Sequence, residues 1–438
     1  LTNGSKVVVN NHNGMGLGYE AIGVMDVDAI STFETTQSFL VTAKGTMNIA
    51  GKAIVAGTLT NNGVINLTAE GATLKAQEGL TVNSTVEGRD VSYADGVYST
   101  KLGLKGKGTE AEPFLIGNIE ELMAFRNSVN GGETKYSAPG VYVALAADID
   151  MAGENWVGIG SATADHGFMG NFDGNGYTIK NLALVESEAK EGKAYVGFFG
   201  YAKDATIKDV TFENVYINIP CLDIDHSQGH IGAVAGSLEG TSTIENVNVK
   251  GDIKVEATVT ANGASRVAVV AGGNSYGNVT MKNVHVIANE GSYLKANNNT
   301  GALAGQLQGK SVFENCSSNI DVTGYKFFAG GIIGLAAGDS KFTDCHTTGD
   351  ITITAGREGR ANDQYRVGGI AGGWADNVKT ACVLNNCSYT GKVSGTNADG
   401  SVAFPLDCLG YVGRGYSAIA GSVVIIDGTK FTYLGDGK

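Results

Sequence analysis

A Gly-rich segment recurs six times after residue 190, and this repeat constrains the fold more than any other feature of the sequence. Each copy combines apolar or small residues with glycine and ends on a glycine, and the closing glycines lie 29 to 38 residues apart. They are Gly200, Gly236, Gly272, Gly305, Gly334 and Gly372. One copy cannot bury its apolar positions alone, whereas stacked copies can, through parallel strands about 4.8 Å apart. The repeat therefore predicts stacked β coils.

A second strand pattern follows each Gly-rich run. In Ile244-Glu245-Asn246-Val247 the first and fourth residues are apolar and the two between them are polar, and the other copies follow the same scheme. The third residue is Asn or Asp in every copy. Because Asn and Asp side chains bond to their own backbone and tolerate left-handed conformations, we expect this position to turn the chain.

The composition agrees with a β fold and excludes several other classes. Of 438 residues, 65 are Gly and 4 are Pro, which disfavours long helices and, without a three-residue period, excludes collagen. The hydrophobic share of 42% is enough to bury a core. The net charge of −13 makes nucleic acid and an anionic membrane poor partners. No apolar run is long enough to span a bilayer.

Three further motifs precede the repeats. They are Ala147-Asp148-Ile149-Asp150, Trp156-Val157-Gly158-Ile159-Gly160 and Gly170-Asn171-Phe172-Asp173-Gly174-Asn175-Gly176-Tyr177-Thr178-Ile179. Together with repeats such as Val367-Gly368-Gly369-Ile370-Ala371-Gly372, this series resembles the GLUG-repeat surface proteins of gut Bacteroidetes. The resemblance covers residues 108–395, and the third repeat departs from it with Ala268 in place of the first glycine. It implies a right-handed parallel β-helix, also called a β-solenoid, and an extracellular, adhesin-like role.

The sequence pattern divides the chain into four regions. Residues 1–104 alternate apolar and polar in short runs, which predicts a β-rich region, either a separate small domain or extra coils. Residues 105–190 hold one helix and the first coils, and residues 191–395 hold the repeats. Residues 396–438 are expected to form a terminal coil or cap. Since the chain starts at Leu1 rather than Met, we expect a trimmed N-terminus with any signal peptide or lipid anchor upstream.

One helix is predicted, over residues 119–130. Asn118 is a suitable N-cap, Glu121 stands at the capping-box position, and Gly131-Gly132 ends the helix. Its expected apolar stripe consists of Ile119, Leu122, Met123 and Val129. Because the end of a strand stack exposes unpaired edges, we expect this helix to cover that end.

Three cysteines replace Val at a core position of the last three repeats. They are Cys316, Cys345 and Cys387. We interpret them as small apolar fillers, and the alternative is a disulfide between successive coils, for which parallel Cβ vectors give poor geometry. The other cysteines (Cys221, Cys382 and Cys408) lack repeat partners. No Cys-x-x-Cys pair is present, so no structural zinc site is expected.

No catalytic or metal-binding motif is present. The sequence lacks His-Glu-x-x-His, Gly-x-Ser-x-Gly and a phosphate loop. Asp148 and Asp150 share one strand face, which we interpret as part of a turn. Asp223, Asp225 and His226 form the densest polar cluster, near His230, and we interpret it as a solvated loop rather than a cation site. We expect no cofactor, no metal and no enzymatic activity.

The connections between coils carry the expected ligand-binding residues. These connections are residues 219–230, 256–266, 289–299, 323–328 and 355–366. Aromatic rings and guanidinium groups suit sugars and protein hot spots. The candidates are Tyr293, Tyr325, Arg357, Arg360 and Tyr365, together with Asp223, Asp225 and His226. The alternative is that the aromatic residues pack locally and the arginines are solvated.

The sequence therefore favours a non-catalytic, adhesin-like protein of the bacterial outer surface. We expect it to be extracellular and to contact a host or bacterial surface glycan or glycoprotein. One alternative is a carbohydrate-active β-helix enzyme, for which Asp223, Asp225 and His226 are the nominees. Another is a structural spacer within a longer exported protein.

Overall fold

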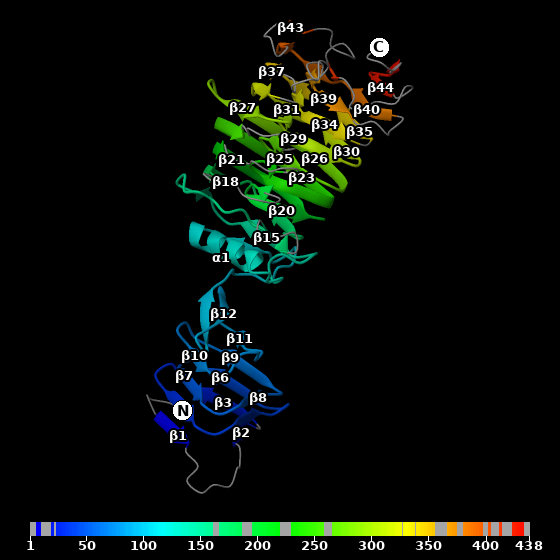
Figure 1. The fold of residues 1–438 in the computed structure, drawn as a ribbon. Helices are drawn as coiled ribbons and strands as arrows, with labels where there is room; N and C mark the ends of the chain where they lie inside the picture. The colour runs from blue at the N-terminus through cyan, green and yellow to red at the C-terminus, as the bar shows by residue number, and fades with distance from the viewer. Residues whose placement is uncertain are drawn as a thin grey trace. The chain divides into compact units, whose positions relative to one another are not determined.

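The chain divides into two compact units, Leu1–Lys107 and Gly108–Lys438. The computed structural model describes residues 6–9, 19–21, 23–160, 166–185, 195–219, 229–257, 265–325, 327–337, 339–354, 366–374, 380–396, 402–403, 411–413 and 423–432. Within these residues the regular structure consists of 45 β-strands and one α-helix. Large parallel sheets dominate it, so the predicted all-β class is confirmed (Figure 1).

Three sheets build the first unit. The first runs in the order β1 (Lys6–Val9), β4 (Thr32–Thr35), β7 (Lys52–Val55), β10 (Thr73–Lys75), β13 (Val97–Leu102) and β12 (Arg89–Ala94). The second contains β11 (Asn83–Ser84), β9 (Val64–Leu67), β6 (Thr46–Ile49) and β3 (Val24–Val27), and the third β2 (Tyr19–Ala21), β5 (Phe39–Val41) and β8 (Leu59–Asn61). Pairing is parallel until β13, which runs antiparallel to β10 and β12.

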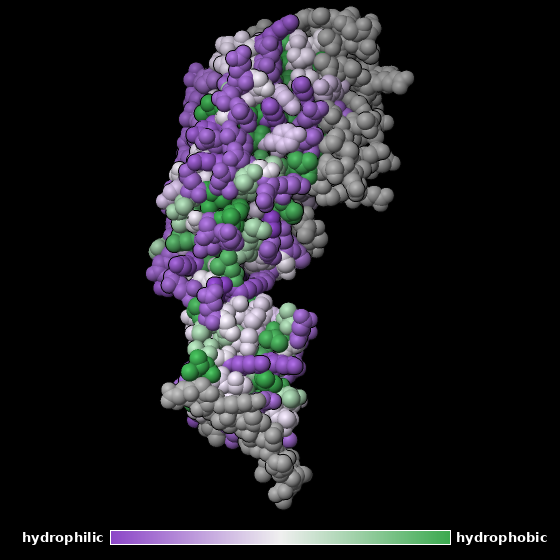
Figure 2. Space-filling view, turned by 90° about the vertical axis from the view of Figure 1, so that its left-hand side faces the viewer, coloured by the Kyte–Doolittle hydropathy of each residue, from purple (hydrophilic) through white to green (hydrophobic). Residues whose placement is uncertain are grey.

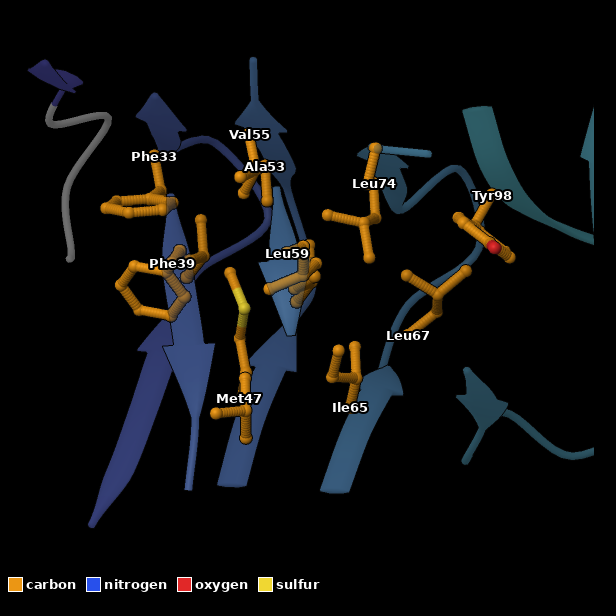
Figure 3. Packing of buried hydrophobic residues seen from close by; sticks show 14 of the residues in the cluster. Phe33, Phe39, Met47, Ala53, Val55, Leu59, Ile65, Leu67, Leu74 and Tyr98 are labelled. Carbon is orange, nitrogen blue, oxygen red and sulfur yellow. The ribbon is translucent and has the colours of Figure 1, made fainter. Parts of the chain in front are cut away.

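Alternation along the short strands builds the core of the first unit. In β6, Met47 and Ile49 are fully buried, while Thr46 and Asn48 are partly exposed. Figure 3 shows Phe33, Phe39 and Met47 pointing into the same interior, where the rings of Phe33 and Phe39 meet edge to face at 5.3 Å. The period of two therefore places one apolar face inward in each strand.

The second strand pattern of each repeat forms one continuous parallel ladder in the second unit. Its strands are β21 (Thr206–Asn218), β23 (Ala235–Ala257), β26 (Gly277–Ala288), β30 (Ser311–Glu314), β35 (Ser340–Thr343) and β40 (Thr380–Asn385). Equivalent repeat positions lie in register and are fully buried: Ile207, Ile244, Met281, Phe313, Phe342 and Leu384. Each repeat therefore rests on the next, position for position.

Each Gly-rich run begins in a separate parallel sheet, makes a turn and ends in the first residues of the next strand. The strands of this sheet are β19 (Tyr195–Val196), β22 (His230–Ile231), β24 (Arg266–Ala268), β28 (Asn299–Gly301), β33 (Phe328–Gly330) and β38 (Val367–Gly368). A Cβ added at Gly334 would lie 2.5 Å from the backbone nitrogen of Thr300, and one at Gly372 would lie 2.6 Å from that of Ala329. Glycine is therefore required at these positions, and likewise at Gly236, Gly272 and Gly305, because successive coils bring their backbones into contact.

The Asn or Asp of each repeat adopts the left-handed conformation that the sequence predicts. Its φ lies between 49° and 53° at Asp209, Asn246, Asn283, Asn315, Asp344 and Asn386. The side chains also bond to one another along the stack. Asn283 Nδ2 donates to Asn246 Oδ1 at 2.8 Å, and Asn315 Nδ2 donates to Asn283 Oδ1 at 2.9 Å. We call the row Asp209, Asn246, Asn283 and Asn315 the asparagine ladder.

The predicted helix is confirmed as α1 (Ile119–Asn130). The backbone N–H of Glu121 donates to Asn118 Oδ1 at 2.9 Å, and Glu121 Oε2 accepts from the N–H of Gly117. The predicted apolar stripe is wrong at Met123, which is 41% exposed, while Phe125, absent from the prediction, is fully buried. Figure 1 shows α1 at the N-terminal end of the strands of its unit, where it buries Leu122, Phe125 and Val129.

The repeat cysteines are buried free thiols. Cys316 and Cys345 are fully buried and Cys387 nearly so. A hydrogen bond with Cys316, with burial adding to its effect, raises the pKa of Cys345 to about 12. Cys382 is also fully buried, whereas Cys221 and Cys408 lie outside the described residues. The sulfurs therefore fill the interior as side chains of small volume.

Antiparallel strands follow the last parallel ones. β45 (Thr429–Thr432) pairs antiparallel with β44 (Val423–Ile426), which itself pairs parallel with β40. Before them, the carbonyl of Tyr411 accepts from the N–H groups of Ile370 and Ala371. Residues 411–413 therefore rest on the sixth repeat.

Candidate ligand-binding surface

Two of the eight predicted site residues belong to the described structure. Tyr293 begins β27 (Tyr293–Ala296), and Tyr325 follows β32 (Val322–Gly324). The sequence places Tyr293 in a connection between coils, and this is wrong, because the residue pairs in register with Lys254 of β23. The other candidates lie outside the described residues: Asp223, Asp225, His226, Arg357, Arg360 and Tyr365.

Strand register brings Tyr293 beside polar and aromatic residues of earlier coils. Tyr216, Lys254 and Tyr293 occupy the same position on three successive strands. Two residues further along the same strands lie Asn218, Glu256 and Lys295. The residues between these positions are buried in the core, among them Ile217, Val255 and Leu294. The alternation that buries the apolar side chains therefore points the other set outward.

Tyr325 joins this group from the next coil. Its backbone N–H donates to the carbonyl of Ala296, the last residue of β27, at 3.0 Å. We define the tyrosine surface as Tyr216, Asn218, Lys254, Glu256, Tyr293, Lys295 and Tyr325. The described residues on the face drawn in Figure 2 are mostly hydrophilic, with hydrophobic residues in small groups.

The rings of the tyrosine surface are held by polar neighbours. Tyr216 is 44% exposed, and Asn218 Nδ2 donates to its hydroxyl at 3.3 Å. The Lys295 ammonium lies 4.4 Å from the centre of the Tyr293 ring, within the range of a cation–π contact. Aromatic rings are thus presented to solvent from rigid strands, in orientations that neighbouring side chains restrict.

Glu256 acts electrostatically on two of these tyrosines. Burial raises the pKa of Tyr293 above its usual value, and the Glu256 carboxylate raises it further. The pKa of Tyr325 is raised by burial and then by Glu256. Both phenols are therefore neutral at physiological pH and can donate hydrogen bonds. The tyrosine surface offers many hydrogen bonds, from a carboxylate, two ammonium groups, an amide and three phenols. It contains no nucleophile with a paired base.

Three of these residues lie outside the predicted connections: Tyr216, Asn218 and Lys254. We expected binding residues in the connections between coils, whereas these side chains lie within strands. Their signal in the sequence is the period-two alternation at the ends of the long strands, with Tyr, Asn, Lys and Glu between apolar residues. The sequence alone did not show which of them stack, because the repeats differ in length.

A second polar group is buried at the Gly-rich sheet. His230 Nδ1 lies 2.9 Å from Ser237 Oγ, which donates to Glu239 Oε1 at 2.9 Å. The Glu239 carboxylate also accepts from the backbone N–H groups of Ser275 and Tyr276. Burial lowers the pKa of Arg266 to about 10, although Glu239 opposes this shift. Ser237 thus donates to Glu239, and the Glu239 carboxylate holds the backbone of Ser275 and Tyr276. The network therefore fixes the turn of the next coil.

The described residues contain neither a cluster of metal-ligating side chains nor a helix that could cross a membrane. No group of three or more His, Cys, Asp or Glu side chains in the described parts of the chain could hold a metal ion. Within the same residues, α1 is far too short and polar to be a membrane span, and no other helix is present.

Fold and surface together define an all-β repeat protein with an exposed tyrosine-rich surface. No family model matches the chain, so the GLUG resemblance stays a prediction.

Halomucin of Haloquadratum walsbyi is 28% identical over 283 residues, which cover 62% of this chain. The match spans 3% of the length of Halomucin. A crystal structure of a candidate immunoglobulin A1 protease from Bacteroides ovatus aligns with a TM-score of 0.46 and 20% identity. That alignment covers 72% of this chain and 86% of the other.

Proposed function

We propose that the chain is a non-catalytic, adhesin-like binding protein of a cell surface or of secreted material. In this proposal its second unit is a right-handed parallel β-helix that serves as a platform, and the tyrosine surface contacts a surface glycan or glycoprotein. The parallel ladder from β21 to β40 supports the platform, because equivalent positions of six repeats stack in register. The GLUG resemblance supports the same fold.

The observation that carries the proposal is the tyrosine surface itself. Tyr216 and Tyr293 project from strands whose opposite faces are fully buried, so the rings are held in place before any ligand arrives. Such pre-organisation reduces the entropy lost on binding. Tyrosine is also enriched at binding hot spots, since its ring offers contact area and its hydroxyl a hydrogen bond.

The proposed location rests on the similarity to Halomucin. The matched region covers 62% of this chain and 3% of Halomucin, and the name of that relative is that of a mucin. The net charge of −13 suits an exposed, soluble surface and disfavours nucleic acid.

Native gels that contain single polysaccharides of plant, host and bacterial origin test the proposal. We expect at least one polysaccharide to retard the protein without being degraded, and we expect the Tyr216→Ala/Tyr293→Ala variant to migrate freely. Tyr276→Ala is the matched control. Tyr276 is also an exposed tyrosine, at 80%, but it lies outside the tyrosine surface, in the turn held by Glu239. A cleared zone after staining would contradict the non-catalytic role, and equal retardation of all variants would contradict the assigned surface.

A further inference from the structure

We propose that the tyrosine surface binds a neutral polysaccharide that runs along the stack of strands, with alternate sugars contacting the side chains of Tyr216 and Tyr293. This inference rests on the proposed function and specifies its ligand. The occupant is an extended chain of equatorially linked pyranoses, and three features of the surface support it: ring spacing, local charge and the polar groups beside the rings.

The spacing of the rings matches a chain with a two-sugar repeat. Tyr216 and Tyr293 occupy one register position, with Lys254 on the strand between them. Two steps between neighbouring strands give about 10 Å. In an extended chain of equatorially linked pyranoses each sugar is rotated by about half a turn, so the same face recurs at every second sugar. The length of that two-sugar repeat is about the separation of the two strands from which the rings project, so the intervening sugar lies over Lys254.

The local charge favours a neutral chain. The surface contains the cations Lys254 and Lys295 and the anion Glu256, and the backbone carbonyl of Asp321 accepts from the N–H of Leu294, the residue after Tyr293. These charges cancel, so the surface provides no net attraction for sulfated or uronic acid chains. The whole chain, at −13, repels polyanions.

The polar groups beside the rings suit sugar hydroxyls. Asn218 and Glu256 lie two residues along their strands from the row of rings, at the edge of the path proposed for the chain. An amide offers a donor and an acceptor, and a carboxylate accepts two hydrogen bonds, which matches neighbouring hydroxyls on one sugar. The ammonium of Lys254 donates to the sugar between the rings.

Calorimetric titration of the full chain with neutral β-linked oligosaccharides of increasing length tests the inference. We expect affinity to rise steeply from disaccharide to trisaccharide and then to level off, because a trisaccharide reaches both rings. Tyr216→Ala and Tyr293→Ala should each weaken trisaccharide binding about tenfold, as expected for hot-spot residues. In either variant the gain with length should disappear, whereas Tyr276→Ala should bind as the unaltered chain does.

Other outcomes separate this inference from the proposed function. Binding only to sulfated or uronic acid chains, lost at high salt, would overturn the neutral ligand but leave glycan binding intact. Binding only to a protein partner would likewise overturn the polysaccharide. Absence of any partner that depends on Tyr216 or Tyr293 would overturn both. The length dependence is measured on the unaltered chain, so it tests the inference even where a variant fails to fold.

Discussion

Replacing Asn283 in the middle of the asparagine ladder tests whether these side chains stabilise the stack. Asn283 has a φ of 51°, and its amide donates to Asn246 and accepts from Asn315. In Asn283→Ala the left-handed backbone is unfavourable by about 1–2 kcal/mol. Loss of two solvated hydrogen bonds adds about 1–2 kcal/mol. We therefore expect the free energy of unfolding to fall by about 2–4 kcal/mol.

A glycine at the same position separates the two contributions. Asn283→Gly loses the hydrogen bonds but relieves the backbone, so it should be about 1 kcal/mol less destabilising than alanine. The matched control is Asn248→Ala, at an outward strand position that lacks a positive φ.

Hydrogen exchange of the backbone amides of β26 and β30 measures the effect where it arises. Local exchange is preferable to a single global transition, because long repeat arrays can unfold in parts. Protection should fall most in Asn283→Ala, less in Asn283→Gly and little in Asn248→Ala. Equal protection in all three variants, or a glycine variant less protected than the alanine variant, would show that the asparagine ladder does not stabilise the stack in this way.

Three further predictions follow from the same structure. Gly334→Ala places a Cβ 2.5 Å from the Thr300 nitrogen, so it should lower the free energy of unfolding in a denaturant titration by about 1–3 kcal/mol. The control Gly117→Ala should be tolerated, because the nearest atom to its Cβ lies at 3.5 Å. The pKa of Tyr293 is raised, so its phenol should ionise above the usual value of about 10 in ultraviolet titration, and Glu256→Gln should bring it closer to that value. The stability linked to this shift is complete below about pH 10 and is lost as the pH rises through the folded pKa. Cys345, with a pKa of about 12, should react with a thiol reagent at neutral pH only after unfolding.

The sequence predicts those parts of the fold that depend on short-range chemistry. The left-handed Asn and Asp positions follow from Asx backbone bonding, and the cap of α1 follows from Asn118. The helix stripe is less accurate, since tertiary contacts choose which side of a helix is buried. Phe125 packs edge to face against Phe168 at 5.8 Å, and Met123 is left in solvent.

The candidate surface is only partly predictable, because it depends on register between segments far apart in the sequence. Tyr216 and Tyr293 are 77 residues apart in the numbering, yet they occupy one row once β21, β23 and β27 pair. Repeat length varies around these strands, so counting along the sequence does not align the rows. The chemistry of Tyr293 and Tyr325 is visible in the sequence, whereas their shared neighbour Glu256 is identified by the structure.

A glycan array probed with three proteins tests whether the tyrosine surface binds glycans. The proteins are the unaltered chain, the Tyr216→Ala/Tyr293→Ala variant and the Tyr276→Ala control. We expect the first and third to bind the same neutral glycans and the second to bind none of them. Retention of those glycans by the Tyr216→Ala/Tyr293→Ala variant would contradict the proposed binding surface.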